Sequence, residues 1–188
     1  MTAPTDPSGP LGAVIDRADV AIDALVDRMR GNPVADRVFY SASALGDWSL
    51  LWHLAGATQG VVTRDQGWRR AMRLSLALGV ESAVVNGPVK SMFRRSRPVH
   101  VGDRPHHLRM PLTSSFPSGH ASSAFLAAHL LADRTRGGGL WYVLAGVVAT
   151  SRVHVRIHHA SDVVGGAVLG LALGEVVRRL APLDADPE

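Results

Sequence analysis

"DVVGGAVLGLALGEVVRR", residues 162–179, is an apolar run that ends in two arginines. Its glycines recur at GxxxG-like spacings, which let helices approach closely where lipid supplies no hydrophobic drive. Such a glycine-rich helix would be costly in water, because glycine loses more backbone freedom on folding than any other residue. The segment therefore predicts a tightly packed helix of a membrane bundle. The glycines are Gly165, Gly166, Gly170 and Gly174.

Further apolar segments precede this one, and some are shorter than the roughly 20 residues that span hydrocarbon. Each one alone could also be a buried helix of a soluble protein. Together with 162–177 they predict an all-α, polytopic membrane bundle of about five spanning helices. The preceding segments are 46–63, 71–89, 118–132 and 137–151.

The charges of the connections favour the membrane reading. If each segment crosses, the short Arg-bearing stretches 64–70 and 133–136 and the chain after Arg178 fall on one side, which is typical of the cytoplasm. The other side receives 90–117 and 152–161. These stretches are also basic. The rule that positive residues are enriched on the cytoplasmic side therefore holds only if the basic residues of these stretches have another function.

The N-terminal region predicts an amphipathic helix over 11–30. Its apolar residues recur at helical spacing, and its polar side is too charged to cross lipid, so we expect it to lie in the interface or to pack on a neighbour. An ordinary surface helix is an equal reading. Gly31 and Pro33 should end it. Its polar residues are Asp16, Asp19, Asp23, Asp27 and Arg30.

Length and composition predict one domain. We expect a disordered tail at 1–10, a single membrane-embedded domain at 11–182 and a C-terminal tail at 183–188. The first ten residues lack a secretory signal, which disfavours a soluble periplasmic protein. There is no cysteine, so disulfides and thiolate metal sites are excluded.

The charge of the chain indicates anionic partners. The formal net charge is +4 and the pI is about 10.6, which suits nucleic acid, anionic lipid head groups or a phosphorylated substrate. Nineteen of the twenty basic residues are arginine, and the single lysine is Lys90. An arginine-rich composition does not explain why one lysine remains.

Three stretches on the shared side combine cations, histidines and an aspartate: KSMFRRSRP at 90–98, FPSGH at 116–120 and SRVHVRIHHASD at 151–162. They resemble the type 2 phosphatidic acid phosphatase family, which shares its site with bacterial acid phosphatases and vanadium haloperoxidases. The family pattern is Lys, six residues and Arg-Pro, then Pro-Ser-Gly-His, then Ser-Arg, five residues, His, three residues and Asp. No position of this pattern departs, and the match covers residues 90–162.

The resemblance implies hydrolysis of a phosphate ester without a metal or other cofactor. Phosphoryl transfer depends on positioning and on neutralising the phosphoryl oxygens, which suits these residue types. His158 is then the nucleophile that forms a phosphohistidine, Asp162 accepts a hydrogen bond from its other ring nitrogen, and His120 is the general acid and base. The phosphate-binding residues are Lys90, Arg97, Ser118, Gly119 and Arg152.

The most favoured substrate is a polyprenyl phosphate or diphosphate, followed by phosphatidic acid or phosphatidylglycerol phosphate. The expected location is the cell membrane, with several passes and the active site on the extracytoplasmic side. Expected partners are the lipid phosphate substrate and membrane lipids, with no nucleic acid and a possible homo-oligomer. A vanadate-dependent haloperoxidase and a scaffold with a degenerate site are weaker alternatives.

Local alternatives concern single clusters. His154, His158, His159 and Asp162 could form a metal cluster, but the phosphatase spacing already uses two of them. Arg94 and Arg95 could be a nucleic-acid patch, although no aromatic residues alternate with them. His53 and His129 are expected to hydrogen-bond between helices.

Overall fold

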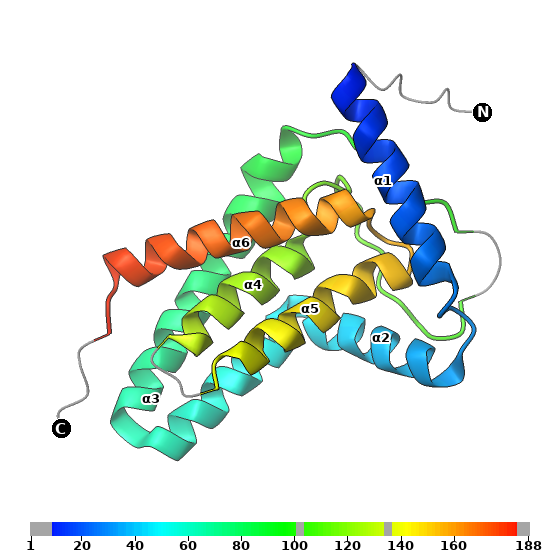
Figure 1. Ribbon diagram of the computed structural model, residues 1–188. Coiled ribbons are helices and arrows are strands. Elements are labelled where there is room, and N and C mark those ends of the chain that lie inside the picture. The colour runs from blue at the N-terminus through cyan, green and yellow to red at the C-terminus, as the bar shows by residue number, and fades with distance from the viewer. Residues whose placement is uncertain (1–8, 101–103, 134–136, 184–188) are drawn as a thin grey trace.

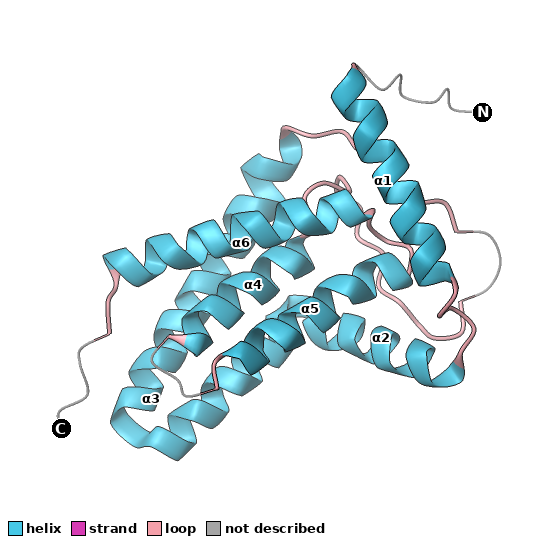
Figure 2. Cartoon of the chain, in the orientation of Figure 1, coloured by secondary structure: helices cyan, strands magenta, loops and turns pink. Residues whose placement is uncertain are grey.

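Helices are the only regular elements in the part of the chain that the computed structural model describes, residues 9–100, 104–133 and 137–183 (Figures 1 and 2). This confirms the all-α prediction. The predicted tails at 1–10 and 183–188 lie almost wholly outside the described residues, and Pro10 already belongs to the first helix. In chain order the elements are α1 (Pro10–Asp27), α2 (Pro33–Gly46), the short 3-10 turn η1 (Asp47–Ser49), α3 (Leu50–Val84), the π-helical turn η2 (Val85–Val89), α4 (Gly119–Ala132), α5 (Gly139–His154) and α6 (Ala160–Leu180).

The helix α2 was not among the predicted segments. Pro33 was expected to end the preceding helix, but it is the first residue of α2, where its missing N–H costs no hydrogen bond. The Asn32 side chain caps this end by accepting from the amides of Val34 and Ala35, at 3.0 and 3.1 Å. The preceding helix ends earlier than expected, at Asp27, so Asn32 and Pro33 only begin α2.

The long helix α3 folds back on itself as a helical hairpin (Figure 1). Nδ1 of His53 lies 3.0 Å from Oγ of Ser75, 22 residues further on, which a straight helix would place about 33 Å away. A Cβ on Gly60 would come within 2.9 Å of the Trp68 ring, so the two arms touch close to the turn. The predicted segments 46–63 and 71–89 therefore correspond to the two arms. The interhelical hydrogen bond expected of His53 is confirmed.

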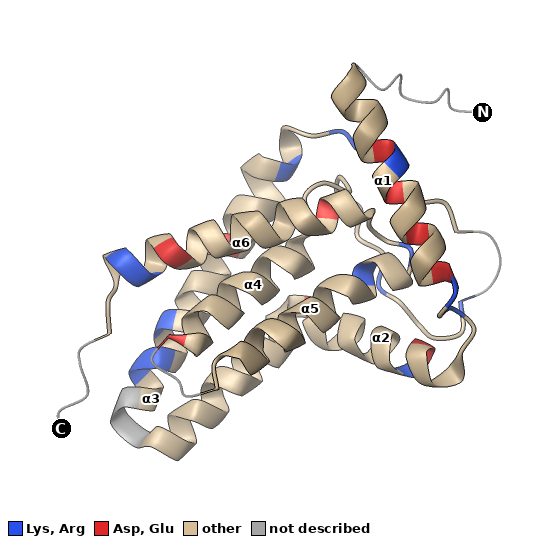
Figure 3. Cartoon of the chain, in the orientation of Figure 1, with Lys and Arg blue, Asp and Glu red and all other residues tan. Residues whose placement is uncertain are grey.

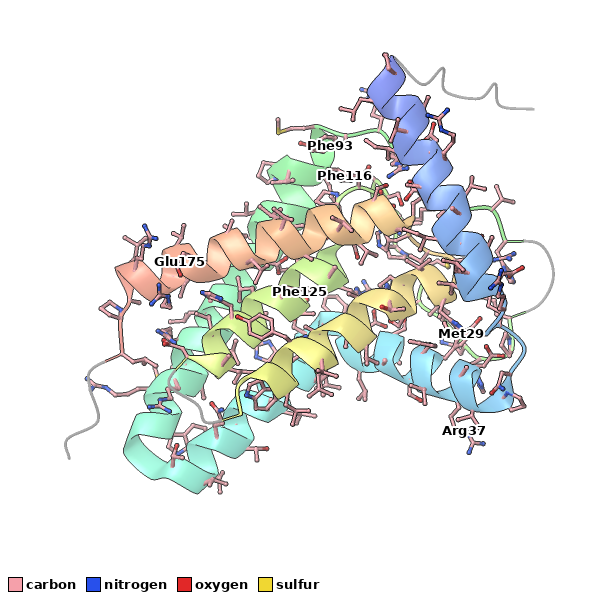
Figure 4. The ribbon with its side chains drawn as sticks, in the orientation of Figure 1. Met29, Arg37, Phe93, Phe116, Phe125 and Glu175 are labelled. Carbon is pink, nitrogen blue, oxygen red and sulfur yellow. The ribbon has the colours of Figure 1, made fainter. Side chains whose placement is uncertain are left out.

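The helix α4 lies at the centre of the bundle, against α6 on one side and α5 on the other (Figure 1). Its small residues and leucines form the main core together with Trp52 and Leu78 of α3. His129 on α4 bonds to both flanking helices, with Tyr142 Oη at 3.0 Å and Glu175 Oε2 at 3.1 Å. Glu175 lies towards the C-terminal end of α6 (Figure 4).

The glycines of α6 set its separation from α4, as their spacing predicts. A Cβ on Gly166 would lie 2.3 Å from the carbonyl oxygen of Ser118, and one on Gly170 would lie 2.1 Å from that of Ser122. Neither backbone oxygen can move without shifting α4. Gly174 similarly faces His129, and Gly165 faces the Phe116 ring, whose Cε2 would be 2.5 Å from a Cβ. Because Ser118 begins α4, this contact also fixes the position of the loop before it.

By length and apolarity, α6 is the one candidate membrane span among the described helices. The count of about five spans therefore stays a prediction. Charged side chains gather towards the two ends of the bundle and on α1, and most of α4 and α5 between the ends carries none (Figure 3). The loops before α4 and between α5 and α6 meet at one end, beneath α1 (Figure 1).

Gly170→Ala should destabilise the bundle, because the new Cβ would overlap the carbonyl oxygen of Ser122. We expect a loss of about 1–3 kcal/mol or more, as for other overpacked positions. Gly146 on α5 is the matched control, since a Cβ there meets nothing within 4 Å. Gly146→Ala should be neutral or gain roughly 0.5–1 kcal/mol from reduced backbone freedom. Thermal unfolding in detergent measures both, and equal stability of the two variants would contradict the packing.

Candidate active site

The three motif stretches converge at the α1 end of the bundle. Nη1 of Arg97 lies 3.3 Å from Nε2 of His158 and donates to the carbonyl oxygen of Ile157 at 3.0 Å. The amide of Ser118 donates to the carbonyl oxygen of Asp162 at 2.9 Å. Each of these contacts joins two of the three stretches, so residues far apart in sequence form one site.

The buried guanidinium of Arg152 has donors left over. It is 1% exposed, and its Nη1 donates to Oγ of Ser43, while Nε and Nη2 have no partner among the described residues. An unsatisfied buried donor of a charged group is costly, so it implies a ligand that accepts from it. A phosphate oxygen fits this requirement.

Lys90 is buried just after η2, and its Nζ donates to Oγ1 of Thr113 at 3.3 Å. Burial, together with the charges of Arg97 and Arg152, lowers the pKa of Lys90 to about 8, although Glu81 opposes this. Because these cations repel one another, negative charge placed between them would be stabilising. A phosphate dianion would supply that charge.

The first turn of α4 adds backbone donors. Ser118 is the N-cap, and its Oγ accepts from the amide of Ala121 at 3.4 Å. The amides of Gly119 and His120 begin the helix and have no partner among the described residues, which is the arrangement that binds anions at helix N-termini. A Cβ on Gly119 would lie 3.2 Å from Oδ1 of Asn86, so the backbone approaches this neighbour closely.

His158 is held as a neutral imidazole with a defined tautomer. Its Nε2 faces Arg97, which can only donate, so Nε2 must carry a lone pair and Nδ1 the proton. Burial, with the nearby Arg152 and Arg97 charges, lowers the pKa of His158 to about 3 even though Asp162 favours the imidazolium. Nε2 is therefore an available nucleophile at neutral pH.

Asp162 is connected to His158 largely through Ser115. The expected direct contact is long, with Nδ1 and Oδ2 3.6 Å apart, because α6 begins at Ala160 and His158 lies in the turn before it. Oγ of Ser115 lies between, 2.6 Å from Oδ2 of Asp162 and 3.4 Å from Nδ1 of His158. Asp162 also caps α6, accepting from the amide of His159 at 2.8 Å.

His120 contacts a carboxylate that the motif does not contain. Its Nε2 lies 3.1 Å from Oδ1 of Asp47 and 3.2 Å from the carbonyl oxygen of Ser43. Both neighbours accept, so Nε2 carries a proton and Nδ1 is free to exchange one. The chain turns sharply directly after Asp47, where Trp48 and Ser49 both have left-handed φ values, 56° and 57°. Such strained backbone is frequent at functional sites.

His154 and Arg95, for which other roles were considered, both have partners within the chain. His154 points away to Asp36, 2.8 Å distant, and no group of three or more potential metal-ligating side chains occurs among the described residues. Arg95 points inward rather than forming an external basic patch, and its Nη1 donates to Oδ1 of Asp162 at 2.6 Å. Ser115, Asp47 and Arg95 are thus site residues that the motif spacing did not reveal.

Comparison with known proteins gives the class of this one. A family model of the PAP2 superfamily matches residues 70–184, and the chain belongs to this superfamily. Decaprenylphosphoryl-5-phosphoribose phosphatase of Mycobacterium tuberculosis is 39% identical over 89 residues, which are 47% of this chain and 49% of that protein. The match thus spans about half of that relative. The protein of the same name from Mycolicibacterium smegmatis is 32% identical over 150 residues, 79% of this chain and 80% of its own.

Solved structures agree with the fold. The transmembrane PAP2-type phosphatidylglycerolphosphate phosphatase from Bacillus subtilis aligns with a TM-score of 0.66 and 26% identity, covering 89% of this chain and 86% of that one. Aquifex aeolicus LpxE aligns with a TM-score of 0.68 and 24% identity, covering 85% and 94%. The helical bundle is therefore that of PAP2 membrane proteins.

Ser115→Ala should slow turnover, because the proton on Nδ1 of His158 then has no acceptor closer than Asp162 at 3.6 Å. We expect kcat to fall about tenfold, which corresponds to about 1.4 kcal/mol, the size of one hydrogen bond. Ser41→Ala, an exposed serine on α2, is the control. Hydrolysis of nitrophenyl phosphate measures both, and equal kcat values would show that Ser115 is not needed between His158 and Asp162.

The charge of Lys90 should appear in the pH profile. Since its pKa in the free protein is about 8, kcat/KM should fall with rising pH above that value as the ammonium loses its proton. Lys90→Arg should lose most activity, since a planar guanidinium cannot replace a compact charge on the same backbone. Its remaining activity should lack this alkaline limb. An unchanged limb in Lys90→Arg would assign it to another group.

Proposed function

We propose that this chain is a membrane lipid phosphatase that hydrolyses a phosphate monoester or diphosphate through a phosphohistidine at His158. The proposal rests on one observation: the site contains both cationic donors without partners and a histidine nitrogen with a lone pair. Nε and Nη2 of Arg152 lack partners, and Nε2 of His158 faces Arg97. A phosphate bound to these donors would present its phosphorus to the imidazole.

Binding would use every group assigned from the motif. The phosphoryl oxygens accept from Arg97, Arg152 and Lys90, and from the free amides at the start of α4. These donors are fixed before the substrate arrives, and they neutralise charge without reorganising, which is the main source of catalysis in phosphoryl transfer. The Ser118 side chain keeps the first turn of α4 in place.

In the first step, Nε2 of His158 attacks phosphorus and the bond to the leaving oxygen breaks. His120 donates a proton from Nδ1 to that oxygen. Burial and the Arg152 charge lower the pKa of His120 to about 4, so the imidazolium form that donates depends on Asp47 and on the negative charge of the bound phosphate. The proton on Nδ1 of His158 stays in place, hydrogen-bonded towards Ser115, and the Asp162 carboxylate offsets the positive charge that develops on the ring. The product is a phosphohistidine and a free lipid alcohol or lipid phosphate.

In the second step, neutral His120 accepts a proton from water as the water oxygen attacks phosphorus. The bond between phosphorus and Nε2 breaks, inorganic phosphate leaves and both histidines return to their first state. The scheme uses only groups of this chain and the substrate. We therefore expect activity to persist in EDTA, and its loss there with recovery on adding a divalent cation would contradict this scheme.

Membrane location is supported by the fold neighbours, one of which is named transmembrane. We propose about five spans, formed by the two arms of α3 and by α4, α5 and α6. The active site then lies on the extracytoplasmic side, and the arginine-bearing turns at the opposite end lie in the cytoplasm. The separation of charged residues towards the two ends of the bundle supports a transmembrane placement (Figure 3).

For the substrate, a polyprenyl phosphate or diphosphate is the first choice. Relatives are named for phosphatase action on a decaprenyl-linked phosphoribose and as a putative undecaprenyl-diphosphatase, which supports a polyprenyl lipid. Phosphatidylglycerol phosphate is the next choice, because a relative and a fold neighbour act on it by name. Phosphatidic acid has the same kind of phosphate.

Leaving-group dependence should separate the two histidines. His158→Ala removes the nucleophile, so every substrate should fail equally. His120→Ala removes the proton donor, which matters most for a lipid alkoxide and least for nitrophenolate or the phosphate end of a diphosphate. The first step should then partly recover on the good leaving groups while hydrolysis of the intermediate stays slow.

A burst of product and an acid-labile phosphate label should therefore occur in His120→Ala and be absent from His158→Ala. Rapid-quench kinetics with nitrophenyl phosphate measures the burst, and phosphopeptide mapping locates the label. Equal loss in both variants on all substrates, without a trapped label, would show that the roles are assigned wrongly.

A further inference from the structure

The helix α1 presents its apolar residues outward. Its two buried residues are Asp19 and Val26, whereas Leu11 is 72% and Leu25 is 55% exposed. Val14, Ile15 and Ile22 are also exposed. A surface helix of a water-soluble protein packs its apolar stripe on the core, so these exposed apolar residues depart from the usual arrangement.

The buried carboxylate of Asp19 ties α1 to the site. Oδ2 accepts from Nη2 of Arg95 and from Oγ of Ser161, both at 2.6 Å, and Oδ1 accepts from the Ser161 amide at 2.7 Å. Ser161 lies in the first turn of α6, one residue before Asp162. Asp19 thus holds the backbone that carries the aspartate of the motif.

Arg95 links the two buried carboxylates. One nitrogen, Nη2, bonds to Asp19, and the other, Nη1, bonds to Asp162 and to Oγ of Ser161 at 2.6 Å each. A guanidinium shared by two buried anions has one permitted position, and removing either partner leaves an uncompensated charge. The position of Asp162, and through Ser115 that of His158, therefore depends on α1.

Two further acidic residues of α1 are about half exposed but form ion pairs within the protein. Asp23 and Asp27 pair with Arg30 at 2.5 and 2.9 Å, and Asp27 also pairs with Arg156 at 2.7 Å. Arg30 in turn donates to the carbonyl oxygens of Val153 and His154 at the end of α5. The polar side of the helix is thus satisfied by contacts within the chain.

With its polar side occupied, the apolar side needs an apolar neighbour from outside the chain. At 100° per residue the apolar residues form a band beside the protein-facing side of α1, rather than opposite to it. A helix that docks sideways on a membrane bundle can lay such a band into the lipid interface. Exposed apolar residues continue along α6, for example Val164 and Val168.

We propose that α1 lies in the lipid interface and completes the active site, with Asp19 and Arg95 as positioning residues for Asp162 and His158. Full turnover then requires a bilayer surface under α1. This inference rests on the proposed phosphatase function for its catalytic part. Its structural part, the burial of α1 in lipid, stands independently.

The first test locates α1 without measuring activity. The chain has no cysteine, so Leu25→Cys and Arg28→Cys can each carry a single nitroxide label in the full-length protein in lipid nanodiscs. Position 25 is on the apolar band, and position 28, the C-cap residue of α1, is exposed on a different side. Oxygen partitions into lipid, and a water-soluble nickel complex does not.

We expect the label at 25 to collide mainly with oxygen and the label at 28 mainly with the nickel complex. Preference for the nickel complex at both positions would overturn the proposal, because α1 would then lie in water. Dipolar broadening at position 25 in nanodiscs that hold two copies would overturn it too, because a second copy of the chain would be the occupant.

The second test uses nitrophenyl phosphate, whose hydrolysis does not require lipid delivery of the substrate. Asp19→Asn and Arg95→Lys should lower kcat in nanodiscs about tenfold or more through misplacement of His158, with KM within about twofold. Asp16→Asn is the matched control, because Asp16 is 59% exposed and reaches only 4.0 Å from Arg95. Thermal unfolding identifies variants that simply fail to fold.

The double variant Ile22→Ser and Leu25→Ser keeps the acidic contacts and removes lipid affinity. The ratio of kcat in nanodiscs to kcat in detergent should exceed one for the wild type and fall towards one for this variant. Equal ratios, or equal kcat for Asp19→Asn and Asp16→Asn, would overturn the catalytic part. Absence of all phosphatase activity in the wild type would instead refute the proposed function and leave the labelling result to decide where α1 lies.

Discussion

The buried carboxylate of Asp162 is the interaction on which the other parts of the site depend. It has no exposed surface, and its two oxygens accept from Arg95, Ser115 and the His159 amide. The same group caps α6, compensates a buried arginine and, through Ser115, leaves the proton of His158 on Nδ1. An ion buried so deeply is tolerated only with all of its partners present. The start of α6, the loop that carries Ser115 and the position of His158 therefore depend on one another.

The packing of α6 on α4 brings the two halves of the site to the same place. Gly166 lies against the Ser118 carbonyl, and Gly170 against that of Ser122, so the first turn of α4 sits directly beside Asp162. A larger residue at either glycine would separate the free amides of α4 from the cations of the α5 end. The close packing of α6 on α4 therefore also positions the groups of the site. The same reasoning extends to α1, whose Asp19 holds the opposite side of the first α6 turn.

Local patterns predicted much of this arrangement. The spacing of Lys90, Arg97, His120, His158 and Asp162 identified the residues that converge, and the glycines of 162–179 identified the tight contact. Residues whose role depends on contacts between distant elements gave no such signal. Asp47 is a carboxylate beyond the motif, Ser115 is a common serine, and Arg95 was first considered as an external patch. Gly31 and Pro33 were expected to end the first helix, but it ends at Asp27 and Pro33 begins α2, which has no long apolar run to predict it. Length and composition identify one candidate membrane span among the described helices, α6, because several other helices of the bundle are short or carry polar residues.

The central claim is that His158 waits as a neutral imidazole with its proton on Nδ1 and its lone pair on Nε2. Nitrogen NMR of the histidine-labelled protein in nanodiscs at neutral pH measures this directly, with His158→Gln to assign the signal. The account predicts a protonated Nδ1 and an unprotonated Nε2 in the resting protein, with a larger share of the Nε2-protonated tautomer in Ser115→Ala. A proton on Nε2, or an imidazolium at neutral pH, would contradict it.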